Sequence, residues 1–285
     1  MKRKNTTTFD LFSPVMSILV MMLLIPYVSF AADISIGGVS LNIPEPPGFS
    51  PVTQQMGKLY EWQKQFVPPI NELFVTFIPD DKVPTALSGH IPTLPRSFSV
   101  LTAKSAIGAS VTTSGFAKLK RMFKTQNDEI TKEVERQMPG LEKKINDGIA
   151  QKFNLDLAFS VSQMIPYAVH EESDRTMAYS ALVKHNENDS AGKPTSYVGA
   201  VTFTLVHVKG KILFLASDAE EGGLEWSRTA SKQWADAVLL ANPPDLQSFA
   251  RELPRGSVGG IVGAVVGTLG ALIWRARKKR HSSSP

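Results

Sequence analysis

The most informative run of this 285-residue chain is YVGAVTFTLVHVKGKILFLAS, residues 197–217. Val201, Phe203 and Leu205 alternate with threonines, which predicts a strand with one buried face. The segment Val208-Lys-Gly-Lys211 predicts a tight hairpin turn in which Gly210 supplies the positive φ. Residues 213–215 are apolar on both faces, so the second strand is expected to be covered from both sides.

Two more strands are predicted just before this hairpin, over residues 164–171 and 176–185, and they extend it into an antiparallel meander. After it, Gly222-Gly223 precedes a predicted helix from Leu224 to Ala241 that ends at Asn242-Pro243-Pro244. The core candidates of that helix are Trp226, Trp234, Val238 and Leu239.

The N-terminal part predicts a mixture of strands and helices. Strands are expected over 34–43 (with Gly37-Gly38 as a bulge or turn), 73–78 and 97–103; a helix over 52–66; and a proline-spaced loop over 82–96. A helical block follows over 114–153, with apolar residues every third or fourth position, and Pro139-Gly140 is expected to divide its second helix.

This order of elements predicts an α+β fold. Strands joined by hairpins form an antiparallel sheet, and helices before and after them must cover its faces, which gives a layered α/β/α sandwich. We assign this fold to residues 32–242, with residues 243–256 as a juxtamembrane linker.

The two ends of this region resemble those of the PsbP-like family. The opening Leu41-Asn-Ile-Pro with Pro47-Gly48-Phe49 is similar to the start of that family, and the apolar strand 212–216 with the Trp-bearing helix after it is similar to its end. The resemblance covers most of residues 34–242 in the order of elements. It implies an α/β/α sandwich and a noncatalytic role in partner binding or membrane-complex assembly. The long helical block and a C-terminal span depart from the family pattern.

Residues 1–31 read as a secretory signal peptide. A basic start is followed by the short apolar run 15–25 and by Pro26, and Ser29 and Ala31 form a small-residue cleavage site after Ala31. An uncleaved N-terminal anchor over 12–30 is the alternative, which two internal prolines disfavour.

A second apolar segment, residues 257–274, carries no charge over 18 residues, just enough for one transmembrane helix. The basic tail 275–285 follows, and its cations place that end in the cytoplasm by the positive-inside rule. These topology determinants are Arg275, Arg277, Lys278, Lys279 and Arg280. Both ends therefore predict a bacterial inner-membrane protein with a single span and its folded domain in the periplasm.

Small residues recur at every fourth position of the predicted span: Gly259, Gly263, Gly267 and Ala271. Such a face lets another helix approach closely, so we expect the span to form a homodimer or to pair with another inner-membrane protein. The alternative is a glycine-rich anchor that binds nothing.

The tail also resembles a GlyGly-type bacterial sorting signal. The matching parts are Gly259-Gly260, the apolar stretch 261–274 and the basic cluster after it. This resemblance implies a secreted body whose C-terminal tag is removed, and it stays open as an alternative to a permanent anchor.

The cysteine content and the distribution of charge exclude several classes of function. The absence of cysteine excludes disulfides, a cysteine nucleophile and thiolate metal sites. The net charge of +5 comes from the ends, because residues 32–274 hold 23 Lys+Arg against 25 Asp+Glu, which excludes a basic nucleic-acid-binding body.

No catalytic motif stands out along the chain. The run His170-Glu171-Glu172 is a metal candidate, but neighbours on a strand point to opposite faces. Asp218, Glu220 and Glu221 suggest a calcium or acid–base site, or simply a charged loop before a helix.

We therefore expect a noncatalytic, membrane-anchored periplasmic binding or assembly protein without a cofactor or metal. Its partners are expected to be the membrane and another inner-membrane or periplasmic protein. An extracytoplasmic, hydrolase-like enzyme with a dispersed site is the alternative.

Overall fold

The computed structural model describes residues 31–125, 127–153, 160–188, 194–220 and 222–244. Its strands are β1 (Ala31–Ile36), β2 (Val39–Pro44), β3 (Phe49–Pro51), β4 (Asn71–Pro79), β5 (Arg96–Ala103), β6 (Ser160–Pro166), β7 (Glu171–Glu172), β8 (Thr176–Asn188), β9 (Pro194–Val208) and β10 (Lys211–Ala219). Its α-helices are α2 (Gly57–Gln65), α3 (Val83–Leu87), α4 (Thr113–Thr125), α5 (Asn127–Phe153) and α6 (Leu224–Ala241), with short 3₁₀ helices η1 (Gln54–Met56), η2 (Asp80–Lys82) and η3 (Lys104–Ala106).

The described strands form a two-stranded hairpin, β1–β2, and one eight-stranded sheet. The sheet order is β3-β4-β5-β10-β9-β8-β6, with β7 also paired to β8, and each pairing is antiparallel. The hairpin expected at residues 208–211 is confirmed: Val208 pairs with Lys211, and Lys209 and Gly210 have φ values of 46° and 73°. The fold is therefore α+β, with an antiparallel sheet and helices packed on it.

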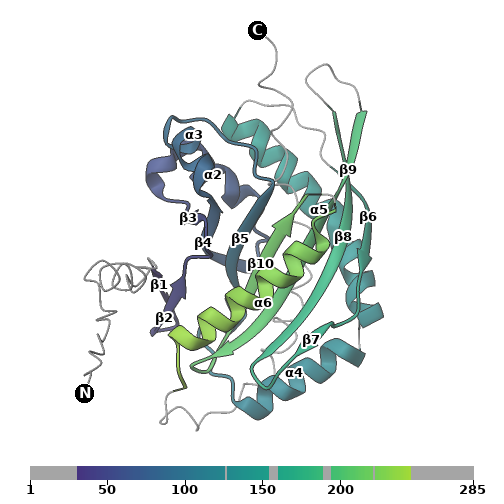
Figure 1. Ribbon diagram of the computed structural model, residues 1–285. Coiled ribbons are helices and arrows are strands. Elements are labelled where there is room, and N and C mark those ends of the chain that lie inside the picture. Colours follow the sequence, from purple (N-terminus) through teal and green to yellow (C-terminus); the bar gives the residue numbers. More distant parts are fainter. Residues whose placement is uncertain (1–30, 126, 154–159, 189–193, 221, 245–285) are drawn as a thin grey trace, which may run out of the picture. The chain divides into compact units, whose positions relative to one another are not determined.

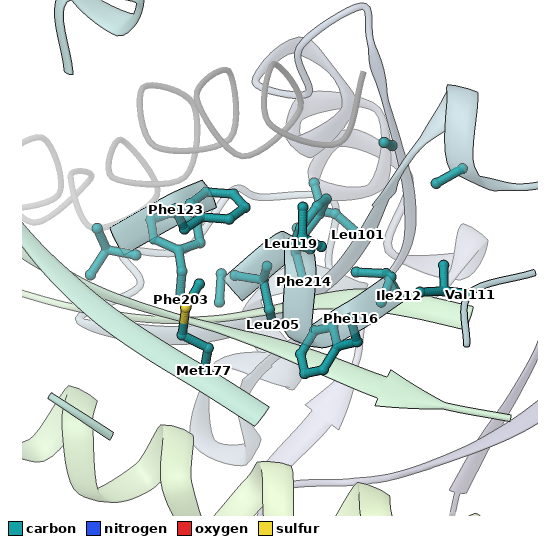
Figure 2. Close-up of a cluster of buried hydrophobic side chains, with 14 of the residues drawn as sticks. Leu101, Val111, Phe116, Leu119, Phe123, Met177, Phe203, Leu205, Ile212 and Phe214 are labelled. Atoms are coloured by element: carbon teal, nitrogen blue, oxygen red, sulfur yellow. The ribbon is translucent and has the colours of Figure 1, made fainter. Parts of the chain in front are cut away.

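Helix α4 covers one face of the sheet. Phe116, Leu119 and Phe123 of α4 lie in one buried cluster with Phe203 and Leu205 of β9 (Figure 2). The same cluster includes Leu101 of β5, Met177 of β8 and Ile212 and Phe214 of β10. Burial of this many large apolar side chains is the main stabilising contribution on this face.

Helix α6 and the β1–β2 hairpin cover the opposite face; α6 runs along the sheet over β10, β9 and β8 (Figure 1). Trp234 packs edge-on against Phe77 and Phe98, and its indole Nε1 donates to the carbonyl of Pro44 at 2.8 Å. The predicted bounds of this helix, 224–241, are confirmed. Of its expected core residues, Trp234 and Val238 are buried, and Trp226 and Leu239 are partly buried.

The N-terminal strand prediction is confirmed in the alternative that makes Gly37-Gly38 a turn. The chain reverses there and pairs with itself, so residues 31–44 form the hairpin β1–β2 and not a strand of the eight-stranded sheet. Gly37 has φ 54°, and a Cβ there would lie only 2.0 Å from the carbonyl oxygen of Ile107. A glycine is therefore required both for the turn and for the close approach to the 104–112 loop.

Two proline predictions were wrong. The expected loop 82–96 contains α3, where Pro84 lies in the first turn, a position that needs no amide hydrogen, and Ala86 is buried. Pro139 does not divide the second helix of the block, since α5 is continuous through it. Pro139 is exposed, and the next turns are anchored by buried Ile145 and Ile149, so packing keeps the helix together across the lost hydrogen bond.

The strand expected over 164–171 is divided in the structure. Strand β6 begins earlier, at Ser160, and ends at Pro166, and the two-residue strand β7 follows separately. Pro166 still pairs with Ala181, and the amide of Tyr167 donates to the carbonyl of Ser180 at 2.8 Å, so the chain stays beside β8 between β6 and β7.

Several predictions lie outside the described residues: the signal peptide (1–30 of 1–31), most of the linker 243–256, the span 257–274 and the tail 275–285. Within the described ranges, no helix is both long and apolar enough to cross a bilayer.

Candidate functional site

A cavity of about 350 Å³ lies beside the connection between α2 and β4. We call it the lysine pocket, because Lys64 of α2, Lys104 of η3 and Lys144 of α5 line it. Its apolar lining is Val52, Val67, Pro68, Pro69, Leu73, Phe74 and Val75. The other lining residues are polar or charged, and a cavity of this size falls in the range of small-molecule sites.

Packing between α2 and α5 brings Lys144 to the pocket. Trp62 and Phe66 of α2 form a buried cluster with Ile145 and Ile149 of α5. Lys144 immediately precedes Ile145, and its Nζ donates to the carbonyl of Val67 at 3.3 Å. The hydrophobic contact therefore fixes the place of the cation.

Strand register brings Lys104 to the same cavity. Asn71, the first residue of β4, pairs with Ala103, the last residue of β5. The chain then turns into η3, and the amide of Lys104 donates to the carbonyl of Ile70 at 2.9 Å. Lys104 consequently lies opposite the beginning of β4, next to the prolines that end α2.

The three lysines differ in their electrostatic partners. Lys64 Nζ lies 2.7 Å from Glu61 Oε1 and 3.9 Å from the centre of the Tyr60 ring, and the hydrogen bond to Glu61 raises the pKa of Lys64. For Lys104 and Lys144, no ion pair is found among the described residues. Partial burial, and then the nearby Lys104 cation, lower the pKa of Lys144. The pocket therefore holds two cations that repel each other.

A buried amide and one carboxylate complete the lining. Gln63 is 5 % exposed, and its Oε1 has no hydrogen-bond partner within the described part of the chain. Glu72 is exposed and is the acidic side chain of the lining. A buried acceptor without a donor costs free energy unless a ligand or water supplies one.

A serine–histidine pair elsewhere deserves comparison with a hydrolase site. His170 Nε2 lies 3.0 Å from Ser180 Oγ, and burial, then the Arg228 cation, lower the pKa of His170. Ser180 is 0 % exposed, however, and Arg228 Nε and Thr202 Oγ1 lie 3.2 and 2.9 Å from its oxygen. A nucleophile must reach its substrate, so this arrangement favours structure over catalysis.

Hydrogen bonds connect the Ser180 and Thr202 hydroxyls to a further hydroxyl beneath α6. Ser227 Oγ lies 2.6 Å from Thr202 Oγ1 and 2.8 Å from the carbonyl oxygen of Ser217. We call Ser180, Thr202 and Ser227 the hydroxyl network; it links β8, β9 and α6 in the interior. Serines at 227 and 231 were absent from the predicted core, although small residues four apart are what allows a helix to lie close to a sheet.

The side chains of Glu171 and Glu172 point to opposite faces of the sheet, as strand geometry predicts. Glu171 lies 2.6 Å from Lys232 of α6, whereas Glu172 lies 3.1 Å from Lys120 and 2.7 Å from Lys124 of α4. The hydrogen bonds from Lys124 and Lys120 lower the pKa of Glu172. These ion pairs join each helix to the edge of the sheet.

The other titratable candidates also have structural contacts. Asp218 is buried in β10 and accepts from Ser97 of β5 at 3.2 Å, while Glu221 is outside the described residues. His207 Nε2 lies 2.7 Å from the carbonyl of Val111. In the ranges that the structure describes, no group of three or more His, Cys, Asp or Glu side chains could hold a metal ion.

Most site residues predicted from the sequence are not described. Gly259, Gly263, Gly267 and Ala271 of the span lie beyond residue 244, as do the topology residues Arg275, Arg277, Lys278, Lys279 and Arg280. Ala31 of the cleavage site is the first residue of β1, exposed and paired with Pro44.

Sequence reasoning missed the lysine pocket. Its cations stand 40 residues apart at positions 64, 104 and 144, each inside an ordinary polar context. The available signal was the Pro68-Pro69 break between a helix and a buried strand. That break marks a tight connection, but it does not say which distant lysines face it.

Comparison of this chain with known proteins finds only a weak likeness in fold. No family model matches the chain, and no curated protein matches it. Among solved structures, the chain is similar to the Ran-binding protein Mog1p of Saccharomyces cerevisiae, with 11 % identity and a TM-score of 0.24 over 85 % of this chain and 94 % of that chain. This is a weak likeness in fold, and it carries no argument about family or function.

Proposed function

We propose that this chain is a noncatalytic, membrane-anchored binding protein of the bacterial periplasm. The observation that supports binding is the lysine pocket, a cavity of about 350 Å³ whose mixed polar and apolar lining includes the side chains of Lys104 and Lys144. The sequence supports the location: residues 1–31 as a signal peptide, 257–274 as a single span and 275–285 as a cytoplasmic tail.

The partners in this proposal are the membrane and another inner-membrane or periplasmic protein. The small-residue face at Gly259, Gly263, Gly267 and Ala271 would join two copies of the span, or the span and a partner helix. Binding in the pocket and pairing in the membrane are separate properties, so each needs its own test.

Reporter fusions test the location. Alkaline phosphatase, which folds only outside the cytoplasm, is fused ahead of Arg255, and green fluorescent protein is fused after Arg280. We expect both fusions to be active. Phosphatase activity at the first position together with an intact Arg280 in the mature protein, detected by mass spectrometry, supports a permanent anchor. Activity confined to a cytoplasmic reporter ahead of Arg255 would overturn the proposal.

Co-purification tests the span. Two differently tagged copies of the full chain are expressed together, with Gly263→Ile and Gly267→Ile as the disrupting variants. Bulky side chains should prevent close helix approach and reduce co-purification. The matched control is Val265→Ile, which enlarges a residue off the glycine face. Equal recovery of all variants would remove the glycine face from the proposal.

A further inference from the structure

The lysine pocket has three properties that together define a ligand class. Its cations at Lys104 and Lys144 form no ion pair among the described residues, its lining includes an apolar part at Val67, Leu73 and Phe74, and its volume of about 350 Å³ suits a small molecule. We propose that the pocket binds a small organic anion: a carboxylate or phosphate monoester carried on an apolar body. The inference rests on the proposed binding function and names its ligand.

Charge placement supports an anionic head group. Lys64 is already neutralised by Glu61 at 2.7 Å, whereas Lys144 contacts a neutral carbonyl, that of Val67, at 3.3 Å. An anion between Lys104 and Lys144 would relieve their mutual repulsion and accept charge-assisted hydrogen bonds from both. Glu72 opposes a second negative charge at its end of the lining, which favours a single anionic group per ligand.

The remaining lining supports an apolar body on the ligand. Val67, Leu73 and Phe74 would contact this body and exclude water from it.

Ligand-observed NMR with the purified full chain in detergent tests this inference. The probes are phenylacetate and phenyl phosphate, and phenylacetamide is the neutral isostere. We expect at least one anion to bind, with an affinity that falls as salt rises because the attraction is partly screened. The tighter of the two anions assigns the head group as carboxylate or phosphate. Equal binding of phenylacetamide would overturn the anion assignment, and binding of none of the probes would overturn the inference.

Variants locate the site. Lys104→Gln and Lys144→Gln should each weaken the bound anion about tenfold, as expected for one lost charge-assisted contact. The double variant Lys104→Arg with Lys144→Arg keeps both charges and should retain binding. Lys118→Gln, at an exposed lysine of α4 that is not among the residues lining the pocket, is the matched control. Unchanged affinity in both glutamine variants would overturn this site.

These outcomes are independent of the membrane experiments. A chain with correct periplasmic topology that binds no anion would lose the ligand inference and keep its proposed location. If the chain stayed in the cytoplasm and still bound an anion, the proposed location would be lost and the ligand inference would be kept. Because Lys104 and Lys144 are both exposed, their replacement is not expected to unfold the protein.

Discussion

The hydroxyl network under α6 and the lysine pocket beside α2 differ in whether their polar groups have partners within the protein. Ser180, Thr202 and Ser227 are fully buried, and hydrogen bonds join them to one another. In the pocket, Gln63 Oε1 has no partner among the described residues, and Lys104 and Lys144 have no ion pair there. Satisfied polar groups hold the layers together, while unmatched ones beside a cavity provide capacity for a ligand. Four measurements test this contrast.

The largest effect is expected from Thr202→Val. The substitution keeps the shape but removes the hydroxyl between Ser180 and Ser227, so the free energy of unfolding should fall by about 2 kcal/mol. Urea denaturation measures it. Thr229→Val, at an exposed position of α6, is the control and should change little. Stability equal to the wild type would show that the network contributes nothing.

A smaller effect of opposite sign is expected from Gln63→Leu. Removing a buried acceptor without a partner should raise the free energy of unfolding by about 1 kcal/mol. The control is Gln65→Leu, because Gln65 Nε2 already donates to the carbonyl of Glu61 at 3.2 Å and has no such penalty to relieve. Thermal or urea unfolding of Gln63→Leu that shows a loss would mean that this amide is structural and not part of a binding surface.

The next effect is a pH dependence that arises at His207. Burial is the main cause that lowers the pKa of His207 in the folded protein; the nearby Arg175 cation adds to it, and the hydrogen bond to Val111 opposes it. The unfolded chain therefore binds more protons below about pH 6.5, so stability is present above that pH and is lost as the pH falls through it.

Urea unfolding at pH 7.5 and 5.5 measures this dependence, and we expect the contribution of this group to make the protein less stable at pH 5.5. His207→Gln should reduce the difference, since it removes the titrating ring. His170, whose pKa is also lowered, remains in both proteins and cancels in the comparison. The same pH dependence in the variant would exclude His207 as its source.

The smallest effect is electrostatic and lies in the pocket. Lys104→Gln should raise the pKa of Lys144, because one of the two causes that lower it is removed. Burial is the larger cause and stays, so the pKa should not return fully to the ordinary lysine value. NMR of the lysine side-chain amines measures the change. An unaltered pKa would show that the two cations are too far apart to share an anion.

Local pattern was enough to predict most of the elements. Alternation at 201–205 and the Lys209-Gly210 turn predicted β9 and β10, and the Gly-Gly start and Pro-Pro end of 222–244 predicted α6. The effect of prolines on the helices was harder to predict, because Pro84 lies in the first turn of a helix and Pro139 lies inside another. A proline restricts its own φ, but the packing of its neighbours decides whether a helix continues.

The pairing of strands that lie far apart in the sequence could not be predicted from the local pattern of apolar and polar residues. Strand β5 pairs with β10 across more than a hundred residues, so the helical block and strands β6 to β9 lie, in the sequence, between two strands that are neighbours in the sheet. The candidate site depends on such contacts, since Lys64, Lys104 and Lys144 meet only through the β4–β5 register and the α2–α5 cluster.

Residue order alone establishes the class of this protein: an antiparallel α+β fold, no cysteine chemistry and a neutral body between basic ends. These properties follow from composition and from periods of two and 3.6 residues, which any short window contains. The pocket and the hydroxyl network follow from three-dimensional packing. Side chains that lie far apart along the chain become neighbours only when strands register and helices bury their apolar faces, and no local period encodes that meeting.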